Sequence, residues 1–424
     1  MTVRFAPREF DGICSLRRRL CQIVATCVFA LGPPSYSQCI TDLGVLPGLA
    51  WSEAASVSDD GSVVVGRCWS ASSEPHGFLW GAVSGMQSVE AIGDFPSDAT
   101  AVSADGTTIV GWRSSELGSV GFRLRTTGED AGFTELVALD GCGTFPVAVS
   151  ADGRVVLVLL GCDFGLPGAA ILADRRAPVL IFYGLQGSYP LAISADGMVA
   201  TGRLMESCFA GICWRAGSGL QPIVPPSPFI GACPLALNSN GDMIAGFVGT
   251  SEGSQAFRWS TRDGFGFLRP REDSRSEFAR DICDNGSVIV GVSQSSSENR
   301  AVVWLSGGSA LLLRDVITAR GIDVAEWSEL NVAAAISGDG RFVVGHGVHR
   351  GEVRAFLVDF GEDPWLVCTA DLNADALVAG ADLGILLSQW GPASAVTVSD
   401  LNRDGIVDGA DLGYLLANWG PCSN

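Results

Sequence analysis

The sequence predicts a mainly β protein: a seven-bladed β-propeller followed by a small α-helical, EF-hand-like module at the C-terminus. Three observations lead to this fold class. One phrase recurs seven times between Ser56 and Gly345, its copies are spaced like propeller blades, and a duplicated acidic segment follows a composition change after Pro364. Radial repetition places every copy of a loop on the same face, so the repeat itself predicts which loops share a binding face.

Each copy of the phrase consists of an apolar pair, a polar residue, an Asp-Gly or Asn-Gly turn and a short β-branched run that closes on Gly. The turn glycines are separated by 45, 47, 44, 44, 45 and 54 residues, a period typical of four-stranded blades; they are Gly61, Gly106, Gly153, Gly197, Gly241, Gly286 and Gly340. The turns differ from sialidase Asp-boxes, because their Gly comes one position too early and the following Trp is missing. We therefore interpret them as structural turns.

The second copy illustrates the expected blade. Residues 101–103 form a strand, the Asp-Gly pair turns the chain, residues 107–111 return, and residues 121–124 form a third strand. A fourth strand precedes the next copy. Antiparallel order puts the Asp-Gly turns on one face, and puts both the second-to-third loops and the blade-to-blade crossovers on the other. The seventh copy lacks a fourth strand, so we expect residues 40–44 to complete it. The Trp residues of the third strands are interpreted as packing core.

These phrases resemble the HAF family of extracellular repeats. The resemblance is carried by Asp42-Leu43-Gly44, residues 57–66 and His76-Gly77-Phe78-Leu79-Trp80, and it covers roughly residues 40–360. It implies an exported protein and carries no assigned chemistry. Two copies depart from the pattern, because Val158 replaces a closing Gly and Cys283 replaces a polar residue.

Composition excludes several classes of function. The formal net charge is −19, so nucleic acid is not an expected partner. All 27 basic residues are Arg, which excludes a Lys Schiff base and a phosphate-binding P-loop Lys. Only His76, His346 and His349 offer an imidazole.

The N-terminus indicates an export signal. Arg17, Arg18 and Arg19 precede the apolar residues 20–31, and the small-residue pattern at residues 35–37 follows. The apolar run is too short to span a bilayer, so no membrane span is expected. Removal of residues 1–37 would leave a secreted, extracellular or periplasmic protein.

Beyond the predicted propeller, residues 38–362, and a linker, residues 363–367, the composition changes in residues 368–424. Two segments 29 residues apart match each other and offer oxygen ligands at EF-hand spacing, which predicts Ca²⁺ as the cofactor. The predicted ligands are Asp371, Asn373, Asp375, the Leu377 carbonyl and Asp382 in the first loop, and Asp400, Asn402, Asp404, the Ile406 carbonyl, Asp408 and Asp411 in the second. Each loop runs into an amphipathic helix that stops at a Gly-Pro pair.

The two loop-helix units resemble a type I dockerin, the module that plugs exported proteins into cohesin domains. The resemblance implies a cohesin-like partner. Ala376 and Ala379 depart from the pattern in the first loop, and Gly380-Ala381 and Gly409-Ala410 lie where many dockerins carry Ser or Thr for partner recognition. The alternative is a calcium-stabilised mini-domain without a partner.

Ten cysteines remain after removal of the signal, an even number in an oxidising compartment, so disulfides are expected. A pseudo-dyad between the two loop-helix units would bring Cys368 and Cys422 together. On the propeller, a bridge between Cys142 and Cys162 is expected to brace the crossover face, where Cys68, Cys208 and Cys233 are also expected.

The function we expect is a secreted, non-catalytic binding or scaffold protein. Its propeller would bind a polysaccharide or a cell-surface component, and its module would dock it; no catalytic residue is assigned. The alternative is a polysaccharide-degrading glycoside hydrolase, which needs two carboxylates in a cleft on the propeller's top face. The crossovers offer seven candidates without a spacing that singles out a pair: Glu53, Asp94, Asp98, Asp140, Glu277, Glu326 and Glu329.

An aromatic residue precedes each copy of the phrase, and the seven are Trp51, Phe95, Phe145, Tyr189, Phe229, Phe278 and Trp327. One interpretation is that they fill the gaps between blades and are buried. The other is that some are exposed and stack on sugar rings. Trp51 and Trp327, beside Glu53 and Glu329, are the ligand-binding candidates under the second interpretation.

Overall fold

The computed structural model describes residues 38–71, 74–89, 95–116, 118–128, 130–137, 142–162, 168–174, 176–182, 188–204, 210–305, 308–361, 370, 372, 377–393, 399–401 and 405–421. The predicted export signal and the predicted linker lie outside these residues. The described chain consists mainly of β-strands.

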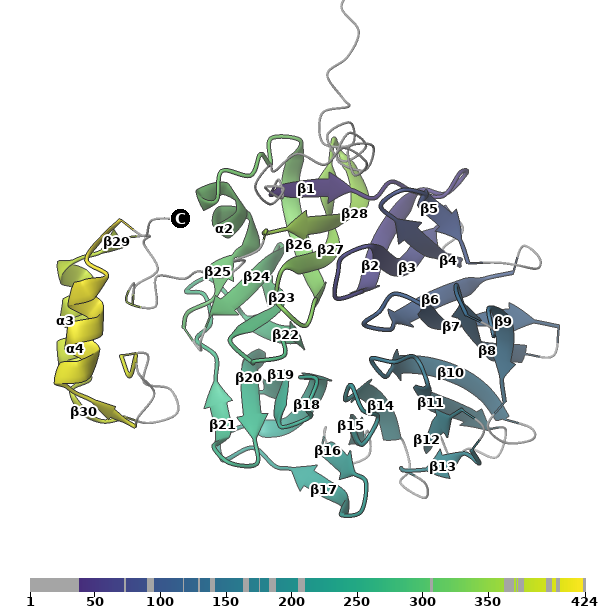
Figure 1. The fold of residues 1–424 in the computed structure, drawn as a ribbon, viewed down its shortest axis with the longest axis horizontal. Helices are drawn as coiled ribbons and strands as arrows, with labels where there is room; N and C mark the ends of the chain where they lie inside the picture. Colours follow the sequence, from purple (N-terminus) through teal and green to yellow (C-terminus); the bar gives the residue numbers. More distant parts are fainter. Residues whose placement is uncertain are drawn as a thin grey trace, which may run out of the picture.

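The strands of residues 39–359 form seven groups of four, which we call blades, and the blades surround a common centre (Figure 1). Blade 1 contains β2 (Trp51–Val57), β3 (Val63–Trp69), β4 (Pro75–Gly81) and β5 (Gly85–Ser88). Blade 2 contains β6 (Ser97–Val102), β7 (Thr108–Ser115), β8 (Gly118–Arg125) and β9 (Gly132–Leu136). Blade 3 contains β10 (Cys142–Val149), β11 (Val155–Cys162), β12 (Gly168–Ala173) and β13 (Val179–Leu180).

The remaining blades follow the same antiparallel order. Blade 4 contains β14 (Ser188–Ile193), β15 (Val199–Leu204), β16 (Ala210–Arg215) and β17 (Gly219–Ile223). Blade 5 contains β18 (Ile230–Leu237), β19 (Met243–Gly249), β20 (Ser254–Ser260) and β21 (Gly264–Phe267). Blade 6 contains β22 (Ser276–Ile282), β23 (Val288–Gln294), β24 (Asn299–Leu305) and β25 (Leu311–Leu312), followed by helix α2 (Leu313–Ala319). Blade 7 contains β26 (Trp327–Ile336), β27 (Phe342–His349), β28 (Glu352–Asp359) and β1 (Cys39–Asp42).

The ring closes through its first strand. Strand β1 pairs antiparallel with β28, from Cys39 opposite Asp359 to Asp42 opposite Phe356. This pairing confirms that the N-terminal strand completes the last blade. Closure of this kind covers an otherwise open sheet edge and ties the two ends of the ring together.

The repeated turn is held by the same side-chain bonds in five blades and by related bonds in blades 5 and 6. In blade 2 the Ser103 hydroxyl donates to Asp105 Oδ1 (2.6 Å) and accepts the N–H of Thr108 (3.0 Å), while Asp105 Oδ1 also accepts the N–H of Thr107 (2.9 Å). Ser58, Ser150, Ser194 and Ser337 repeat this arrangement, and Asn238 and Cys283 take the hydroxyl's place in blades 5 and 6. These bonds confirm a structural role for the turns.

Each first strand carries a β-bulge at the same place, which leaves one residue unpaired in the ladder. The unpaired residues are Ala55, Thr100, Val147, Leu191, Leu235, Arg280 and Ala334. Beside the bulge, the first strand's backbone lies close to the second strand: a Cβ on Gly111 would stand 2.0 Å from the Asp98 carbonyl oxygen. The close approach explains why the phrase closes on Gly, and only blade 3, with Val158, departs.

The core lies between neighbouring blades. One cluster joins β3, β6 and β7 around Phe122, and another joins β2, β27 and β28 around Phe78. The third-strand residues Trp80 and Trp304 are buried, as the sequence predicted, whereas Trp214 and Trp259 are half-buried.

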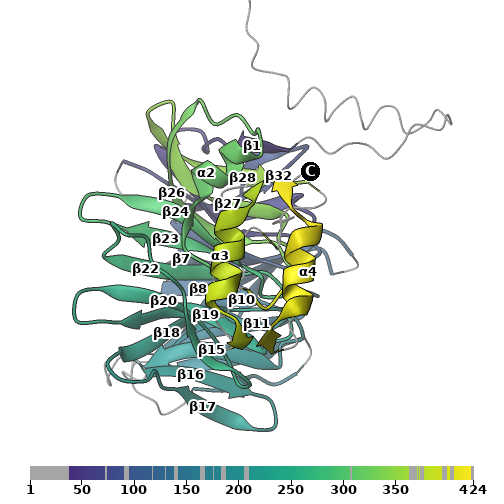
Figure 2. The same ribbon diagram turned by 90° about the vertical axis from the view of Figure 1, so that its left-hand side faces the viewer.

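The C-terminal module contains two helices, α3 (Gly380–Ser388) and α4 (Gly409–Ala417), which lie side by side (Figure 2). Two short strand pairs link the units reciprocally. Strand β29 (Leu377–Val378) pairs with β32 (Gly420–Pro421), and β30 (Gly391–Pro392) pairs with β31 (Ile406–Val407). Each unit thus pairs its loop strand with the end of the other unit, as expected for a pseudo-dyad. Among the described residues, the fully buried apolar side chains of the module are Ala370, Val378, Leu386, Val407 and Leu415.

Candidate functional site

Charged side chains from several blades meet at the centre of the ring. They occupy the first strand just before the bulge, the bulge itself, or the second strand opposite. Blade 1 contributes Glu53 and Arg67, blade 2 Asp98, blade 6 Arg280 and blade 7 His346. We call these five residues the axial cluster. Each of the five residues is the bulge residue, precedes the bulge in its first strand, or pairs with a first-strand residue that precedes the bulge. The axial cluster therefore lies toward the crossover end of the first strands.

Arg67 links two blades within this cluster. Its Nε donates to Glu53 Oε2 (3.1 Å) and its Nη1 donates to Asp98 Oδ2 (3.0 Å). Burial raises the pKa of the Asp98 carboxyl, and the nearby Arg67 only partly opposes the rise. Burial alone would lower the pKa of Arg67, but Asp98 and Glu53 outweigh it, so the guanidinium stays charged.

Arg280 and His346 lie on the other side of the same cluster. Burial lowers the pKa of His346; Glu53 opposes this shift, while Arg280 and Arg67 reinforce it. Burial likewise lowers the pKa of Arg280, and Arg67 adds to the effect. Groups from blades 1, 6 and 7 can shift one another's pKa only if they lie close together. They do so where the first strands converge on the axis.

Arg280 differs from Arg67, the other guanidinium of the cluster, in its partners. The residue is exposed to solvent, although protein atoms surround its guanidinium. Within the described part of the chain, no carboxylate forms an ion pair with it. The axial cluster therefore offers one guanidinium that an anionic group can reach, and a guanidinium binds carboxylates in a bidentate manner.

The turn end of the axis is occupied by structural bonds instead. The N–H of Asp59 donates to the Ala104 carbonyl (2.9 Å), that of Ala195 to Ser239 (2.8 Å) and that of Asp284 to Gly338 (2.9 Å). These bonds connect the turns of neighbouring blades. The two ends of the axis thus differ, and the crossover end carries the groups that are available to a ligand.

The seven predicted aromatic residues have mixed environments. Trp327 is 3% exposed and packs edge-on against Phe356 (5.7 Å between ring centroids), so the expectation that it is exposed was wrong. Because Trp327 packs against β28, the third strand of blade 7, its ring offers no exposed surface on which a sugar could stack. Trp51 is half-buried and stacks on Trp69 (6.5 Å), beside the axial cluster, and its role in sugar binding stays a prediction.

The predicted carboxylate candidates do not gather in one place. Glu53 and Asp98 meet on Arg67, and Glu277 is buried between blades 5 and 6. Glu326 accepts from Arg350 and contacts His349, and Glu329 accepts from Asn331 (3.0 Å). Asp94 and Asp140 lie outside the described residues.

Four cysteines outside the two predicted bridges are free thiols in buried positions; they are Cys68, Cys213, Cys233 and Cys283. Burial raises the pKa of Cys68 and of Cys233 to about 11. Cys142 and Cys162 lie directly opposite each other in the pairing of β10 and β11. Their bridge stays a prediction, and Cys368, Cys422 and Cys208 lie outside the described residues.

The second predicted calcium loop has the hydrogen bonds of an EF-hand-like turn. Asp400 Oδ2 accepts the N–H of Gly405 (3.0 Å), and the fully buried Asp411 accepts the N–H of Leu401 and of Asp408 (2.7 and 2.8 Å). Asp382 repeats the arrangement in the first loop, accepting from Leu372 and Ala379 (2.7 and 2.8 Å). Asn402, Asp404, Asp371, Asn373 and Asp375 lie outside the described residues.

The module also exposes apolar side chains in matched pairs, one from each unit. Leu387 and Leu416 are both 52% exposed, and Trp390 and Trp419 are 48% and 49% exposed. The same helix faces carry Leu386 and Leu415, which are buried. The face is therefore divided between the module's core and an exposed apolar surface.

No helix in the described ranges is long and apolar enough to cross a membrane. In those same ranges, no group of three or more His, Cys, Asp or Glu side chains is placed to hold a metal ion.

Sequence reasoning missed Arg67, Arg280 and His346. A signal was present, because the seven copies can be aligned on their turn glycines. At the bulge position, blades 4 and 5 carry Leu191 and Leu235 where blade 6 carries Arg280. A charged residue at a position that is uncharged in the other six blades marks a departure that the fold does not require.

No family model matches the chain, and no curated protein matches its sequence. Solved structures show the fold. Oligogalacturonate lyase from Vibrio parahaemolyticus is similar with a TM-score of 0.54 and 9% identity over 76% of this chain and 94% of that one. The β-propeller domain of the Trilobed protease from Pyrococcus furiosus has a TM-score of 0.50 and 12% identity over 74% and 96%. TolB from Acinetobacter baumannii has a TM-score of 0.44 and 10% identity over 72% of this chain, which spans 65% of TolB's length. The chain has the fold of a β-propeller.

Proposed function

We propose that this protein is an exported, non-catalytic binding protein: a seven-bladed propeller that binds an acidic polysaccharide or surface component at the crossover end of its axis. A C-terminal dockerin-like module folds around Ca²⁺ and docks it. One observation carries the binding role. Arg280 is a solvent-exposed residue at the axis, and its guanidinium, which protein atoms surround, forms an ion pair with no carboxylate among the described residues.

The charges around Arg280 favour an anionic ligand. Arg67 already neutralises Glu53 and Asp98, so Arg280 is the cation left for a ligand. A uronate carboxylate would accept two hydrogen bonds from it, and the half-buried Trp51 offers a ring nearby for stacking. The chain's overall charge of −19 opposes approach of a polyanion, so the attraction has to be local.

The test replaces Arg280 with the residue that blades 4 and 5 carry at the same position. Arg280→Leu should weaken binding to polygalacturonate at least about tenfold, the loss expected for a charge-assisted hydrogen bond, measured by affinity electrophoresis. Arg262→Leu removes the same charge from a side chain that is 92% exposed and serves as the control. Equal losses in the two variants, or retention by Arg280→Leu, would contradict axial binding.

A catalytic role has one observation in its favour. Glu53 and Asp98 accept hydrogen bonds from two nitrogens of a single guanidinium, so two carboxylates stand at the same place on the axis, and glycoside hydrolysis needs a pair of carboxylates. Burial raises the pKa of Asp98, as a general acid requires. Hydrolysis of any polysaccharide in a screen, abolished by both Glu53→Gln and Asp98→Asn, would replace the binding proposal with this one.

The calcium proposal is supported by the donor set of the two loops. Carboxylates and backbone carbonyls are the oxygen ligands that Ca²⁺ prefers, and the bond from Gly405 to Asp400 turns the loop as an EF-hand requires. Asp400, Asp408, Asp411 and the Ile406 carbonyl would hold the ion together with Asn402 and Asp404. Asp382 and the Leu377 carbonyl would serve the first site.

Calorimetry on chelator-treated protein tests this assignment. Two unequal sites are expected, because Ala376 replaces a Gly and Ala379 offers no side-chain oxygen in the first loop. Asp400→Ala should therefore remove the tighter site and Asp371→Ala the weaker one. The reverse order, or no heat on addition of Ca²⁺, would refute the assignment.

The matched Leu and Trp side chains of the module support a docking role. Exposed apolar patches of this kind mark interaction surfaces. A cohesin domain retained by the wild-type protein in Ca²⁺, and lost with the double variant Leu387→Ser, Leu416→Ser, would identify the partner. If no cohesin binds, the module is a calcium-stabilised mini-domain.

A further inference from the structure

We propose a second ligand site, separate from the axial cluster: a pocket between blades 5 and 6 that binds one neutral sugar unit through Glu277. The cavity measures about 500 Å³. It opens among the second-to-third loop of blade 5 and the crossover into blade 6, on the face where both kinds of loop emerge. Its lining residues are Thr250, Glu252, Ser254, Gln255, Pro270, Ser274, Arg275 and Glu277.

Glu277 departs from the repeat. The equivalent position holds Ser52, Ser97, Thr144 and Ser188 in blades 1 to 4, and all four are buried. In three of these blades the hydroxyl accepts a backbone N–H of the preceding third strand: Ser97 from Gly77 (2.9 Å), Thr144 from Gly121 (2.9 Å) and Ser52 from Ala355 (2.9 Å). A small hydroxyl at this position therefore locks one blade to the next.

In blade 6 a neighbouring residue has taken over the lock. Ser276 accepts the N–H of Ser254 (3.1 Å), and these two residues form the parallel pair that joins β20 to β22. The pairing keeps the two blades together although a carboxylate replaces the hydroxyl. Because the structural task is fulfilled by Ser276, Glu277 is available for another role.

The Glu277 carboxyl is incompletely bonded. The residue is 1% exposed, Oε1 accepts the N–H of Arg271 (3.1 Å), and Oε2 has no hydrogen-bond partner among the described residues. The Ser274 hydroxyl donates to the Ser276 carbonyl (3.1 Å), and the Ser274 and Ser293 hydroxyls both lie close enough to Glu277 to oppose the rise in the pKa of its carboxyl. A buried oxygen without a donor is costly, and this one lies at the wall of a cavity.

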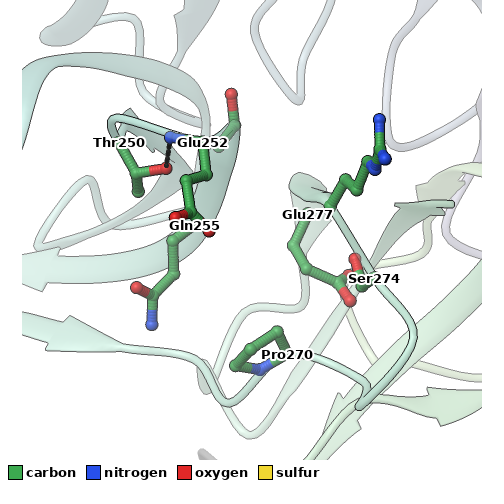
Figure 3. Close-up of a pocket in the computed structure, with 8 residues that line it drawn as sticks. Thr250, Glu252, Gln255, Pro270, Ser274 and Glu277 are labelled. Atoms are coloured by element: carbon green, nitrogen blue, oxygen red, sulfur yellow. Dashed lines mark hydrogen bonds between the residues drawn. The ribbon is translucent and has the colours of Figure 1, made fainter. Parts of the chain in front are cut away.

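The rest of the wall indicates the class of ligand. Figure 3 shows Glu277 and Ser274 on one side of the pocket, Thr250, Glu252 and Gln255 on the other, and Pro270 below them. The lining supplies hydrogen-bond acceptors, Glu252 and Glu277, and hydrogen-bond donors, Arg275 and the serine hydroxyls. The Gln255 amide both donates and accepts. A ligand hydroxyl also donates and accepts, so this lining matches a polyol better than an ion.

No aromatic side chain lines the pocket, so hydrogen bonds rather than ring stacking would hold the sugar. Burial raises the pKa of Glu277, although the N–H of Arg271 opposes the rise. A hydroxyl that donates to Oε2 would supply the bond that the carboxyl lacks. The cavity is of the size that accommodates a small ligand.

The experiment titrates the full-length protein with D-glucose, D-galactose, D-mannose and D-xylose, observed by ligand NMR, with methylammonium as a cationic probe. Glu277→Ser installs the residue of blades 1, 2 and 4. Binding of at least one sugar, weakened about tenfold or more by Glu277→Ser, is the expected result. The variant should stay folded, because it removes a buried carboxylate without enlarging a side chain.

Three results would overturn the proposal: no sugar binds, sugar binding is unchanged in Glu277→Ser and in Gln255→Ala, or methylammonium alone binds. Should Glu277→Ser fail to fold, Glu277→Gln and Gln255→Ala carry the test. Arg280→Leu should leave sugar binding unchanged, and Glu277→Ser should leave polygalacturonate binding unchanged. The failure of either site is therefore distinguishable from the failure of the other.

Discussion

Strand β22 of blade 6 and strand β14 of blade 4 occupy equivalent places in the ring, yet their chemistry differs. Both have the same bulge and the same register with their second strands. At three positions β22 carries Glu277, Arg280 and Asp281, where β14 carries Ser188, Leu191 and Ala192. The ring requires only what the two strands share. Of the three charged residues that β22 adds, Glu277 and Arg280 begin the two proposed sites, whereas Asp281 bonds to the backbone of blade 7.

The same contrast holds along a single blade. Turn residues such as Ser103 and Asp105 have identical bonds in five of the seven blades and serve the fold. Charged residues before the bulge differ from blade to blade. Repetition therefore marks structural positions, and a departure from the repeat marks a candidate site.

The largest expected change in stability concerns a closing Gly, a position that the repeat keeps. Gly291→Ala should destabilise the protein by about 3 kcal/mol, because its Cβ would stand 2.0 Å from the Phe278 carbonyl oxygen beside the bulge of β22. Urea unfolding measures the loss. Gly168→Ala is the control, since no atom of the described residues would lie within 4 Å of the added Cβ, and it should change stability by less than about 0.5 kcal/mol. Equal behaviour of the two variants would show that the closing Gly is not a packing requirement.

Much of the fold follows from the sequence for the same reason. The turn spacing, the closing strand and the two matched units of the module are local or repeated patterns, and each is recovered in the structure. The axial cluster is different. Glu53 and Arg280 are separated by most of the ring in sequence, and only closure brings them to one axis.

The misjudged residues have physical explanations. Trp327 precedes its turn like Trp51 does, but two additional bulges in β26 shift its place along the strand, and it packs against Phe356. Periodicity cannot reveal such shifts, because they add residues to the strand without changing the pattern. The pocket at Glu277 could not be found either, since it depends on Ser276 taking over a bond between two blades.

A change in stability of intermediate size is expected at Asp281, where blade 6 departs from the repeat. The carboxylate accepts the N–H of Ile336 (2.9 Å) in blade 7, and burial raises its pKa to about 7, with Asp284 adding to the rise. Because the folded pKa is above the unfolded value of 3.8, the folded state binds more protons between these values. Asp281 therefore contributes stability fully below pH 4, and this contribution is lost as the pH rises to about 7.

Asp281→Ser removes this titration and keeps an acceptor. Ser56 occupies the equivalent position in blade 1 and accepts the N–H of Val102 (3.3 Å). The fall in stability between pH 4 and pH 7 should therefore be smaller in the variant, by about 1 to 2 kcal/mol after allowance for solvent access. Urea unfolding at pH 4, 5.5 and 7 measures the difference. Parallel pH profiles for the variant and the wild type would show that Asp281 is ionised throughout.

The smallest change in stability is expected when the Ser of the repeat is restored in the turn of blade 6. Cys283 stands where five blades have Ser; its thiol donates to Asn285 Oδ1 (3.1 Å) and accepts the N–H of Val288 (3.2 Å). A thiol is a weak donor and acceptor, so Cys283→Ser should stabilise the protein by about 0.5 kcal/mol, whereas Ser103→Cys in blade 2 should destabilise it by a similar amount. Thermal unfolding of the two variants measures both changes. If Cys283→Ser is destabilising while Ser103→Cys behaves as expected, the thiol packs better at this position than a hydroxyl, and the departure at Cys283 serves the fold of blade 6 rather than being tolerated by it.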